Sequence, residues 1–232
     1  MLNVQDINQY YGSSHTLRGI TMSVKQGECM ALLGRNGVGK TTLLQCLMGV
    51  QSLASGSIHF DGKDIGKLTP HARAALGMAY VPQGREIFAR LTVEENILMG
   101  MATKPSQQAK RIKNEIFDLF PVLRTMLSRR GGDLSGGQQQ QLAIARALEA
   151  EPKLIIFDEP TEGIQPSIIK DIGRVIRLLR DRGDIAILLC EQYFDFAREL
   201  ADRFVVLSRG EVVAQGDQTQ MDSEDVKKHL SV

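Results

Sequence analysis

The chain has 232 residues, 43% of them hydrophobic and 24% charged, a composition typical of ordinary globular protein and sufficient for one α/β domain. Its 28 basic and 27 acidic residues leave a net charge of +1, which argues against a nucleic-acid-binding surface spread over the whole protein. The three cysteines lie outside CxxC and CxxH spacings, so we expect reduced thiols, with Cys190 a small buried hydrophobe. No apolar run reaches the roughly 18 residues that cross a bilayer, and the N-terminus lacks a secretory signal pattern.

Short apolar runs alternate with amphipathic runs, the pattern of a largely parallel sheet covered by helices. The run ECMALLG is typical of a buried strand, and KTTLLQCLMGV after it is typical of a helix. In SGSIHFDGKDI, the Asp61-Gly62 pair predicts the turn of a small hairpin. Thr69 and Pro70 predict the cap and first position of a short helix, and MAYVP predicts the next strand.

The middle of the chain is predicted to be helical. Thr92 and Glu95 form a plausible capping box for TVEENILMG, and the residues from about Pro105 to Leu148 contain no strand candidate. LIIFDE and IAILLC are buried-strand runs with a helix between them. The apolar side of that helix is Ile168, Ile169, Ile172, Val175, Ile176 and Leu179. RFVVLSRGEVVAQG predicts a closing hairpin, followed by a polar tail with a short terminal helix.

A glycine-rich loop, GRNGVGKT, fits the phosphate-binding pattern G-x4-G-K-[ST] directly after a strand and at the start of a helix. Its glycines allow successive N–H groups to face phosphate oxygens, and the helix N-terminus adds a positive dipole end. Lys40 is expected to reach the β- and γ-phosphates of ATP, and the Thr41 hydroxyl to hold Mg²⁺. A chance glycine-rich turn is the alternative, but it explains neither flanking element. The expected nucleotide-binding residues are Gly34, Arg35, Asn36, Gly37, Val38, Gly39, Lys40, Thr41 and Thr42.

Two carboxylates, Asp158 and Glu159, follow the apolar strand LIIF. In an open α/β sheet, ligands bind at the carboxyl ends of the strands, so both acids are expected to face the phosphates. Asp158 is predicted to hold Mg²⁺ through a water, and Glu159 to polarise the water that attacks the γ-phosphate. Taken alone, the pair could equally be two exposed acids in a turn; the glycine-rich loop favours the catalytic interpretation.

The pentapeptide Leu134-Ser135-Gly136-Gly137-Gln138 precedes the helix-like run QQQLAIARAL. The Ser135 hydroxyl and the glycine amides at a helix N-terminus form a second anion site. LSGGQ between a P-loop and a strand ending in Asp-Glu is the order found in the ATP-binding-cassette (ABC) family. The chain resembles that family from end to end.

The resemblance implies an α/β fold: a RecA-like P-loop NTPase core, a small antiparallel β subdomain and an inserted helical subdomain. One ABC ATP-binding domain is expected over residues 1–232, with the catalytic core in 1–83 and 151–232 and the helical signature subdomain in 84–150. In the family, the residues that match Ser135, Gly136, Gly137 and Gln138 contact the γ-phosphate of ATP on the P-loop of the other subunit. ATP would therefore join a head-to-tail dimer, and hydrolysis would release it.

Three further positions are assigned by the resemblance. Tyr11 matches the aromatic residue that stacks on adenine, with Tyr10 as the alternative. Gln83, in YVPQGREIF, matches the loop glutamine that touches Mg²⁺ and the attacking water. Gln192 stands where many members have a histidine that contacts the γ-phosphate. Because glutamine carries no positive charge, we expect slower intrinsic hydrolysis than in a relative with histidine.

A second departure follows Thr161, where this chain reads EGIQ at 162–165 and many members read SALD. That segment crosses the dimer interface in the family, so subunit communication is expected to differ in detail. PTEGIQPSII, with the Glu-Gln pair that replaces histidine, resembles the branched-chain or hydrophobic amino acid uptake group. Within that group it is most similar to the branch that imports urea or short amides.

The resemblance further implies partners and a location. We expect a peripheral subunit on the cytoplasmic face of the inner membrane, bound to integral membrane permease subunits and paired with a second ABC ATPase. The pair would be a heterodimer in nature, with a homodimer possible in isolation, and an extracytoplasmic solute-binding protein would act indirectly. Arg85, Glu86 and Phe88 are expected near the groove that receives the permease, or else are ordinary surface and core residues.

The alternative functions are those of a soluble ABC ATPase, a P-loop kinase or GTPase, and an exporter ATPase. A soluble ABC ATPase acting on DNA or ribosomes would carry two cassettes or a long coiled-coil insert, and only 95 residues separate Lys40 from Ser135. No nucleic-acid partner is therefore expected. A P-loop kinase or GTPase has no use for LSGGQ, and the chain has no NKxD segment. An exporter ATPase differs only by its partner and stays open.

Overall fold

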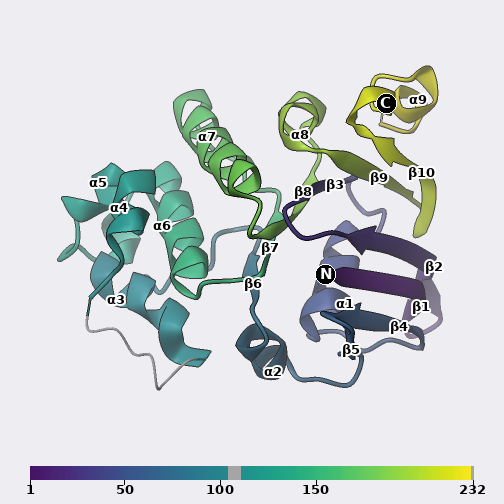
Figure 1. Cartoon of the computed structure of the whole chain (residues 1–232), viewed down its shortest axis with the longest axis horizontal. Helices are drawn as coiled ribbons and strands as arrows, with labels where there is room; N and C mark the ends of the chain where they lie inside the picture. The colour runs from purple at the N-terminus through teal and green to yellow at the C-terminus, as the bar shows by residue number, and fades with distance from the viewer. Residues whose placement is uncertain (104–110, 231–232) are drawn as a thin grey trace.

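The computed structural model describes residues 1–103 and 111–230 (Figure 1). Its larger sheet has the strand order β10-β9-β3-β8-β7-β6. The five strands from β9 to β6 run parallel, and β10 pairs antiparallel with β9 as the predicted closing hairpin. The strands are β3 (Cys29–Leu33), β6 (Met78–Val81), β7 (Leu154–Asp158), β8 (Ala186–Glu191), β9 (Arg203–Ser208) and β10 (Glu211–Asp217). The expected parallel sheet of apolar strands is confirmed.

A second, antiparallel sheet has the order β2-β1-β4-β5. It contains β1 (Leu2–Tyr11), β2 (Ser14–Val24), β4 (Ser55–Phe60) and β5 (Lys63–Asp64). Asp61 and Gly62 both have positive φ, 49° and 77°, as a tight hairpin turn requires. The two long N-terminal strands are not evident from the sequence, because the pairing register shifts between Val4 and Ile7 and interrupts the alternation of buried residues.

Helices cover both faces of the larger sheet, as expected for a parallel sheet. They include α1 (Lys40–Met48), α2 (Pro70–Ala75), α7 (Pro166–Arg182), α8 (Phe194–Leu200) and α9 (Glu224–Leu230). Ile176 of α7 shares one buried cluster with Phe157 of β7, whereas Leu44 of α1 shares another with Ile156. Adjacent residues of a strand point to opposite faces, so α7 and α1 lie on opposite sides of the sheet (Figure 1). The predicted α2 start is confirmed, since Thr69 caps the helix and Pro70 occupies its first position.

The described part of the segment between β6 and β7 consists of short helices joined by turns and loops. It contains α3 (Val93–Leu98), η1 (Met99–Thr103), α4 (Asn114–Leu119), α5 (Pro121–Arg124), η3 (Gly131–Asp133) and α6 (Gly136–Glu149). The Thr92–Glu95 capping box is confirmed in both directions. The helical prediction from Pro105 to Lys110 lies outside the described residues. Leu142 and Ile144 of α6 join the same buried cluster as Ile155 of β7, which attaches this segment to the core.

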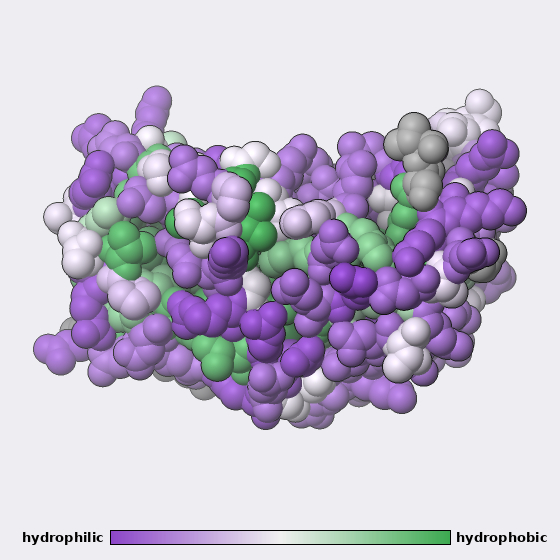
Figure 2. Space-filling view, turned by 90° about the horizontal axis from the view of Figure 1, so that it is seen from above, coloured by the Kyte–Doolittle hydropathy of each residue, from purple (hydrophilic) through white to green (hydrophobic). Residues whose placement is uncertain are grey.

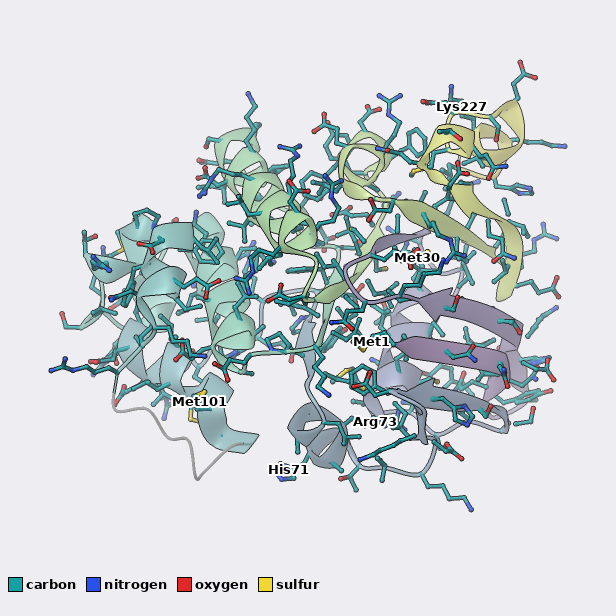
Figure 3. All side chains as sticks on the ribbon, viewed as in Figure 1. Met1, Met30, His71, Arg73, Met101 and Lys227 are labelled. Carbon is teal, nitrogen blue, oxygen red and sulfur yellow. The ribbon has the colours of Figure 1, made fainter. Side chains whose placement is uncertain are left out.

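A buried arginine fixes the end of α1. Arg73 of α2, labelled in Figure 3, is 1% exposed and donates from Nη1 to the carbonyls of Cys46 and Leu47, both at 2.7 Å. Its Nε donates to the Leu68 carbonyl at 3.1 Å. The last carbonyls of a helix have no partner within the helix and carry its negative dipole end, so a cation there stabilises α1.

The face shown in Figure 2 is mainly hydrophilic at its edges, with hydrophobic residues gathered in its left part and centre. Among the described residues, no helix combines the length and apolar character of a membrane span.

Candidate functional site

The glycine-rich loop joins β3 to α1, as predicted. Leu33 ends the buried strand, and Lys40 is the first residue of the helix. Gly39 occupies the N-cap position with φ 108°, a backbone conformation that glycine adopts at little cost. The loop and the helix N-terminus border a cavity of about 280 Å³. Its lining residues are Thr16, Arg35, Asn36, Gly37, Gly39, Lys40, Thr41, Thr42, Gln83 and Glu159.

This cavity collects residues from four places in the sequence. The structure brings Gln83 and Glu159 to the predicted phosphate loop, while Gly34 and Val38 of the same loop do not line the cavity. Thr16, in β2, was not predicted from the sequence, and a lone threonine on a strand gives no signal for it.

Lys40 is almost completely buried. Its ammonium donates to the carbonyls of Gly34 at 2.7 Å and Arg35 at 3.2 Å, and lies 3.1 Å from Glu159 Oε1. A buried ammonium requires such partners, because an unpaired buried charge is very costly. The lysine of the loop and the carboxylate proposed as base are therefore in direct contact.

Asp158 provides a test of the magnesium prediction. It is 1% exposed, and its Oδ2 accepts a 2.8 Å hydrogen bond from the Tyr80 hydroxyl, whereas its Oδ1 has no hydrogen-bond partner. Burial raises the pKa of this carboxyl, and the Tyr80 hydrogen bond acts against that rise. An unpaired buried carboxylate oxygen, with Thr41 and Gln83 in the adjoining cavity, fits the oxygen ligands that Mg²⁺ prefers.

No cluster of three or more histidine, cysteine, aspartate or glutamate side chains that could hold a metal is found in residues 1–103 and 111–230. The oxygen donors here that could hold Mg²⁺ are those of Asp158, Thr41 and Gln83.

Gln83 lies beside the proposed base. Its Nε2 donates to Glu162 Oε2 at 2.8 Å and more weakly to Glu159 Oε2 at 3.5 Å. Glu159 itself has φ 47°, a strained conformation for a residue with a side chain. In the sequence, Glu162 stands out only as part of the departure at 162–165, and no local pattern signals its contact with Gln83.

Gln192 follows β8 at the same edge of the sheet as the acid pair. The parallel register places Asp158 opposite Cys190, two residues before Gln192. Gln192 is exposed and does not line the cavity around the loop. The structure therefore places it at the same edge of the sheet as Asp158 and outside the cavity.

Tyr11 is the last residue of β1 and is 46% exposed. Its hydroxyl donates to Gln45 Oε1 of α1 at 3.4 Å, so it lies beside the helix that begins at the phosphate loop. The alternative residue, Tyr10, stacks on His15 with ring centroids 4.1 Å apart. The Tyr10 ring is already paired, and this favours Tyr11 as the surface for an adenine ring, although Tyr11 does not line the cavity itself.

The 135–138 turn is open at the surface. Ser135 is exposed and caps α6, accepting from Gln138 N at 3.4 Å, while Gln138 Oε1 accepts from Ser135 N at 3.0 Å. A Cβ on Gly137 would lie 2.7 Å from Ile168, so glycine is required where α6 approaches α7. None of residues 135–138 lines the P-loop cavity.

The segment after Gln83 has three successive residues with positive φ, Gly84, Arg85 and Glu86. Arg146 of α6 holds it by donating to the Glu86 carbonyl at 2.9 Å and the Arg85 carbonyl at 3.4 Å. The same guanidinium lies 5.1 Å from the centre of the Phe88 ring, which is 44% exposed. The segment is thus tied to the helix that begins at Ser135.

Comparison with known proteins gives the family. A sequence-family model described as ABC transporter matches residues 17–162. The chain is 41% identical over 213 residues to the high-affinity branched-chain amino acid transport ATP-binding protein BraG of Pseudomonas aeruginosa, covering 92% of this chain and 91% of that protein. It is 33% identical over 231 residues to the lipopolysaccharide export system ATP-binding protein LptB of Escherichia coli K12, covering 98% and 95%.

Solved structures agree. A nucleotide-free ATP-binding cassette from an ABC transporter superposes with TM-score 0.82 at 28% identity, covering 100% of this chain and 95% of the other. A dimeric cassette bound to ADP and phosphate has TM-score 0.81 at 21% identity, covering 94% and 99%, and shares the fold. The parallel sheet, the P-loop and the inserted helices define an ATP-binding cassette. The chain belongs to the ABC transporter family, as an ATP-binding and ATP-hydrolysing subunit.

Proposed function

We propose that this chain drives an importer of the branched-chain or hydrophobic amino acid uptake group. It would bind separate permease subunits at the cytoplasmic face of the inner membrane. The 41% identity to BraG over nearly the whole chain supports this group. The segment PTEGIQPSII supports, by resemblance, the branch that takes up urea or short amides.

The nucleotide side of the proposed site is the P-loop cavity. Lys40, Thr41 and Thr42 surround the β- and γ-phosphates together with the loop amides, and Tyr11 stacks on the adenine. Lys40 exchanges its present contacts with Glu159 and the loop carbonyls for phosphate oxygens. The cavity that holds Lys40, Thr41 and Glu159 together is the observation that carries this assignment.

Hydrolysis is proposed to depend on Glu159. Once Lys40 turns to phosphate, the Glu159 carboxylate is free to accept a proton from the attacking water. Gln83, already 3.5 Å from Glu159, and Gln192 orient that water and the γ-phosphate. A magnesium ion held by Thr41, Gln83 and Asp158 would neutralise phosphate charge.

The second half of the site is proposed to come from another cassette. Ser135 is exposed, Gly136 to Gln138 are partly exposed, and all four lie outside their own P-loop cavity, so Ser135 and Gly137 would be available to the γ-phosphate on a partner. Residues 84–88 would contact the permease. Arg146 of α6 would couple this segment to α6 through its hydrogen bond to the Glu86 carbonyl.

The Glu159→Gln variant tests this site. It should bind ATP yet lose turnover by about 10³-fold, and its mass in ATP by light scattering should be twice the 25.6 kDa of one chain. Addition of EDTA should return it to the single-chain mass. Full turnover in this variant would remove Glu159 from the role of base.

Solute and direction require the assembled transporter. Co-expression with candidate permeases and a binding protein, followed by ATP-dependent uptake of labelled urea, acetamide or leucine into vesicles, tests the import assignment. Stable association with lipid-export membrane subunits instead would favour the exporter alternative, which the 33% identity to LptB supports.

A further inference from the structure

One buried carboxylate near the site has no role in the reaction described above. Glu191, the last residue of β8, is 2% exposed. Its Oε1 accepts from the Thr161 hydroxyl at 2.7 Å and from the Thr161 amide at 3.3 Å. Its Oε2 accepts from the amides of Gln192 at 3.0 Å and Tyr193 at 3.1 Å.

The four donors belong to two different loops. Thr161 lies two residues after Glu159 in the loop that follows β7, and Gln192 opens the loop that follows β8. A further bond joins the start of the first loop to the end of β8, since the Glu159 amide donates to the Cys190 carbonyl at 2.9 Å. The Glu191 carboxylate is therefore a bridge between the segment with the proposed base and the segment with the proposed phosphate contact.

The chemistry of this bridge suits a carboxylate. Burial raises the pKa of Glu191, whereas the hydrogen bonds from Thr161, Tyr193 and Gln192 lower it. All four partners are donors, and an ionised carboxylate accepts at both oxygens without having a proton of its own to place. Charge-assisted bonds of this kind are stronger than neutral ones, which offsets part of the cost of burial.

We propose that Glu191 is a positioning residue of the ATPase reaction, which holds the Glu159 loop and the Gln192 loop in one fixed arrangement. The inference rests on the proposed roles of Glu159 and Gln192. Glu191 does not line the nucleotide cavity, so it acts on the rate of hydrolysis through these two loops and not on nucleotide binding.

The Glu191→Gln variant of the full chain tests the bridge. One oxygen becomes an NH₂ group, which cannot accept, so one loop must lose its bonds. We expect kcat for ATP to fall about 10- to 100-fold, with KM within about twofold, because a displaced catalytic group costs rate without weakening uniform binding. Unchanged kcat, or an equal loss of ATP affinity, would overturn the inference.

Two further variants distinguish loss of the bridge from general misfolding. Glu149, at the end of α6, is also fully buried with a pKa raised by burial, and Glu149→Gln should leave turnover unchanged. Thr161→Val removes only the hydroxyl bond at 2.7 Å and should lower kcat by about 3- to 10-fold. If Glu191→Gln does not fold, the kcat of Thr161→Val tests the proposal instead. Full turnover in Thr161→Val would contradict the proposed bridge.

A double variant separates positioning from general damage. If Glu191 acts by placing Gln192, the loss from Gln192→Ala should be much smaller in the Glu191→Gln background than in the native chain. Losses that multiply independently would contradict the inference. An inactive Glu159→Gln beside a fully active Glu191→Gln overturns only the bridge, whereas an active Glu159→Gln overturns the proposed base itself.

Discussion

The two turns that we propose as anion sites, the P-loop and residues 135–138, are built in opposite ways. At the P-loop, Lys40 is buried and already paired with Glu159 and two loop carbonyls around a cavity. At the 135–138 turn, Ser135 is exposed and its capping box with Gln138 satisfies the amides of these two residues. Figure 1 draws α1 beside the two sheets and α6 among the inserted helices.

This difference indicates which half of the proposed site, the P-loop or the 135–138 turn, can bind phosphate without a partner chain. A paired, buried lysine is organised before ligand arrives, so we propose that the P-loop half binds nucleotide in a single chain. An exposed helix N-terminus offers amides but no enclosure, and water competes for them until a partner surface excludes it. Substitutions in the two halves should therefore separate binding from turnover.

The largest effect is expected at the enclosed half. Lys40→Ala removes the buried cation that faces the phosphates, and a charged hydrogen bond of about 1.5–3 kcal/mol corresponds to a roughly 10- to 150-fold loss of ATP affinity. Titration with a fluorescent ATP analogue measures it. Lys153→Ala, which removes an exposed lysine paired with Asp61, is the control and should bind normally. Unchanged affinity in Lys40→Ala would contradict the proposed cradle.

A substitution at the exposed 135–138 turn should lower turnover without weakening ATP binding. Aspartate is as good a helix cap as serine, so Ser135→Asp keeps the start of α6 while placing a negative charge where phosphate is proposed to sit. We expect normal ATP affinity and thermal stability, with turnover reduced by about 100-fold. Normal turnover in this variant would show that Ser135 does not meet phosphate.

The positions of both turns could be predicted from the sequence, because each depends on residue types at fixed spacing. GRNGVGKT and LSGGQ each have glycines at a helix start, and the capping boxes at Thr92 and Ser135 follow from spacing alone. What could not be predicted depends on tertiary approach. The contact of Gln83 with Glu162 joins side chains 79 residues apart, and the Glu191 bridge has no local signature.

The N-terminal sheet shows the same limit in the fold. The Asp61-Gly62 pair predicts the β4–β5 hairpin. In contrast, β1 and β2 contain register shifts that break the two-residue alternation of buried and exposed side chains. β1 also pairs with β4, with a further register shift between Gln5 and Asn8, and the sequence of one strand alone does not reveal this pairing.

The stability of the enclosed half depends on the far end of its helix. Arg73→Met keeps apolar volume but leaves the α1 carbonyls without their cation, and we expect the free energy of unfolding to fall by about 3 kcal/mol. Urea titration followed by circular dichroism gives this value. Arg124→Met on α5, an arginine over the Phe117 ring, should change stability far less. A change below that of the control would show that Arg73 is not needed to hold α1.

The smallest expected effect concerns Gln192. Its side chain is exposed, as at the 135–138 turn, but its backbone amide donates to the buried Glu191 carboxylate. A histidine there could carry a positive charge, which glutamine cannot, and would stabilise charge that develops on the γ-phosphate. Gln192→His should raise kcat by about 5-fold, and the gain should be larger at pH 6 than at pH 8, because the protonated imidazole is the active form. Steady-state ATPase assays at both pH values measure it, with Gln192→Asn as the neutral control. An equal gain in the control would mean that charge is not the cause, and no gain would place Gln192 outside reach of the phosphate.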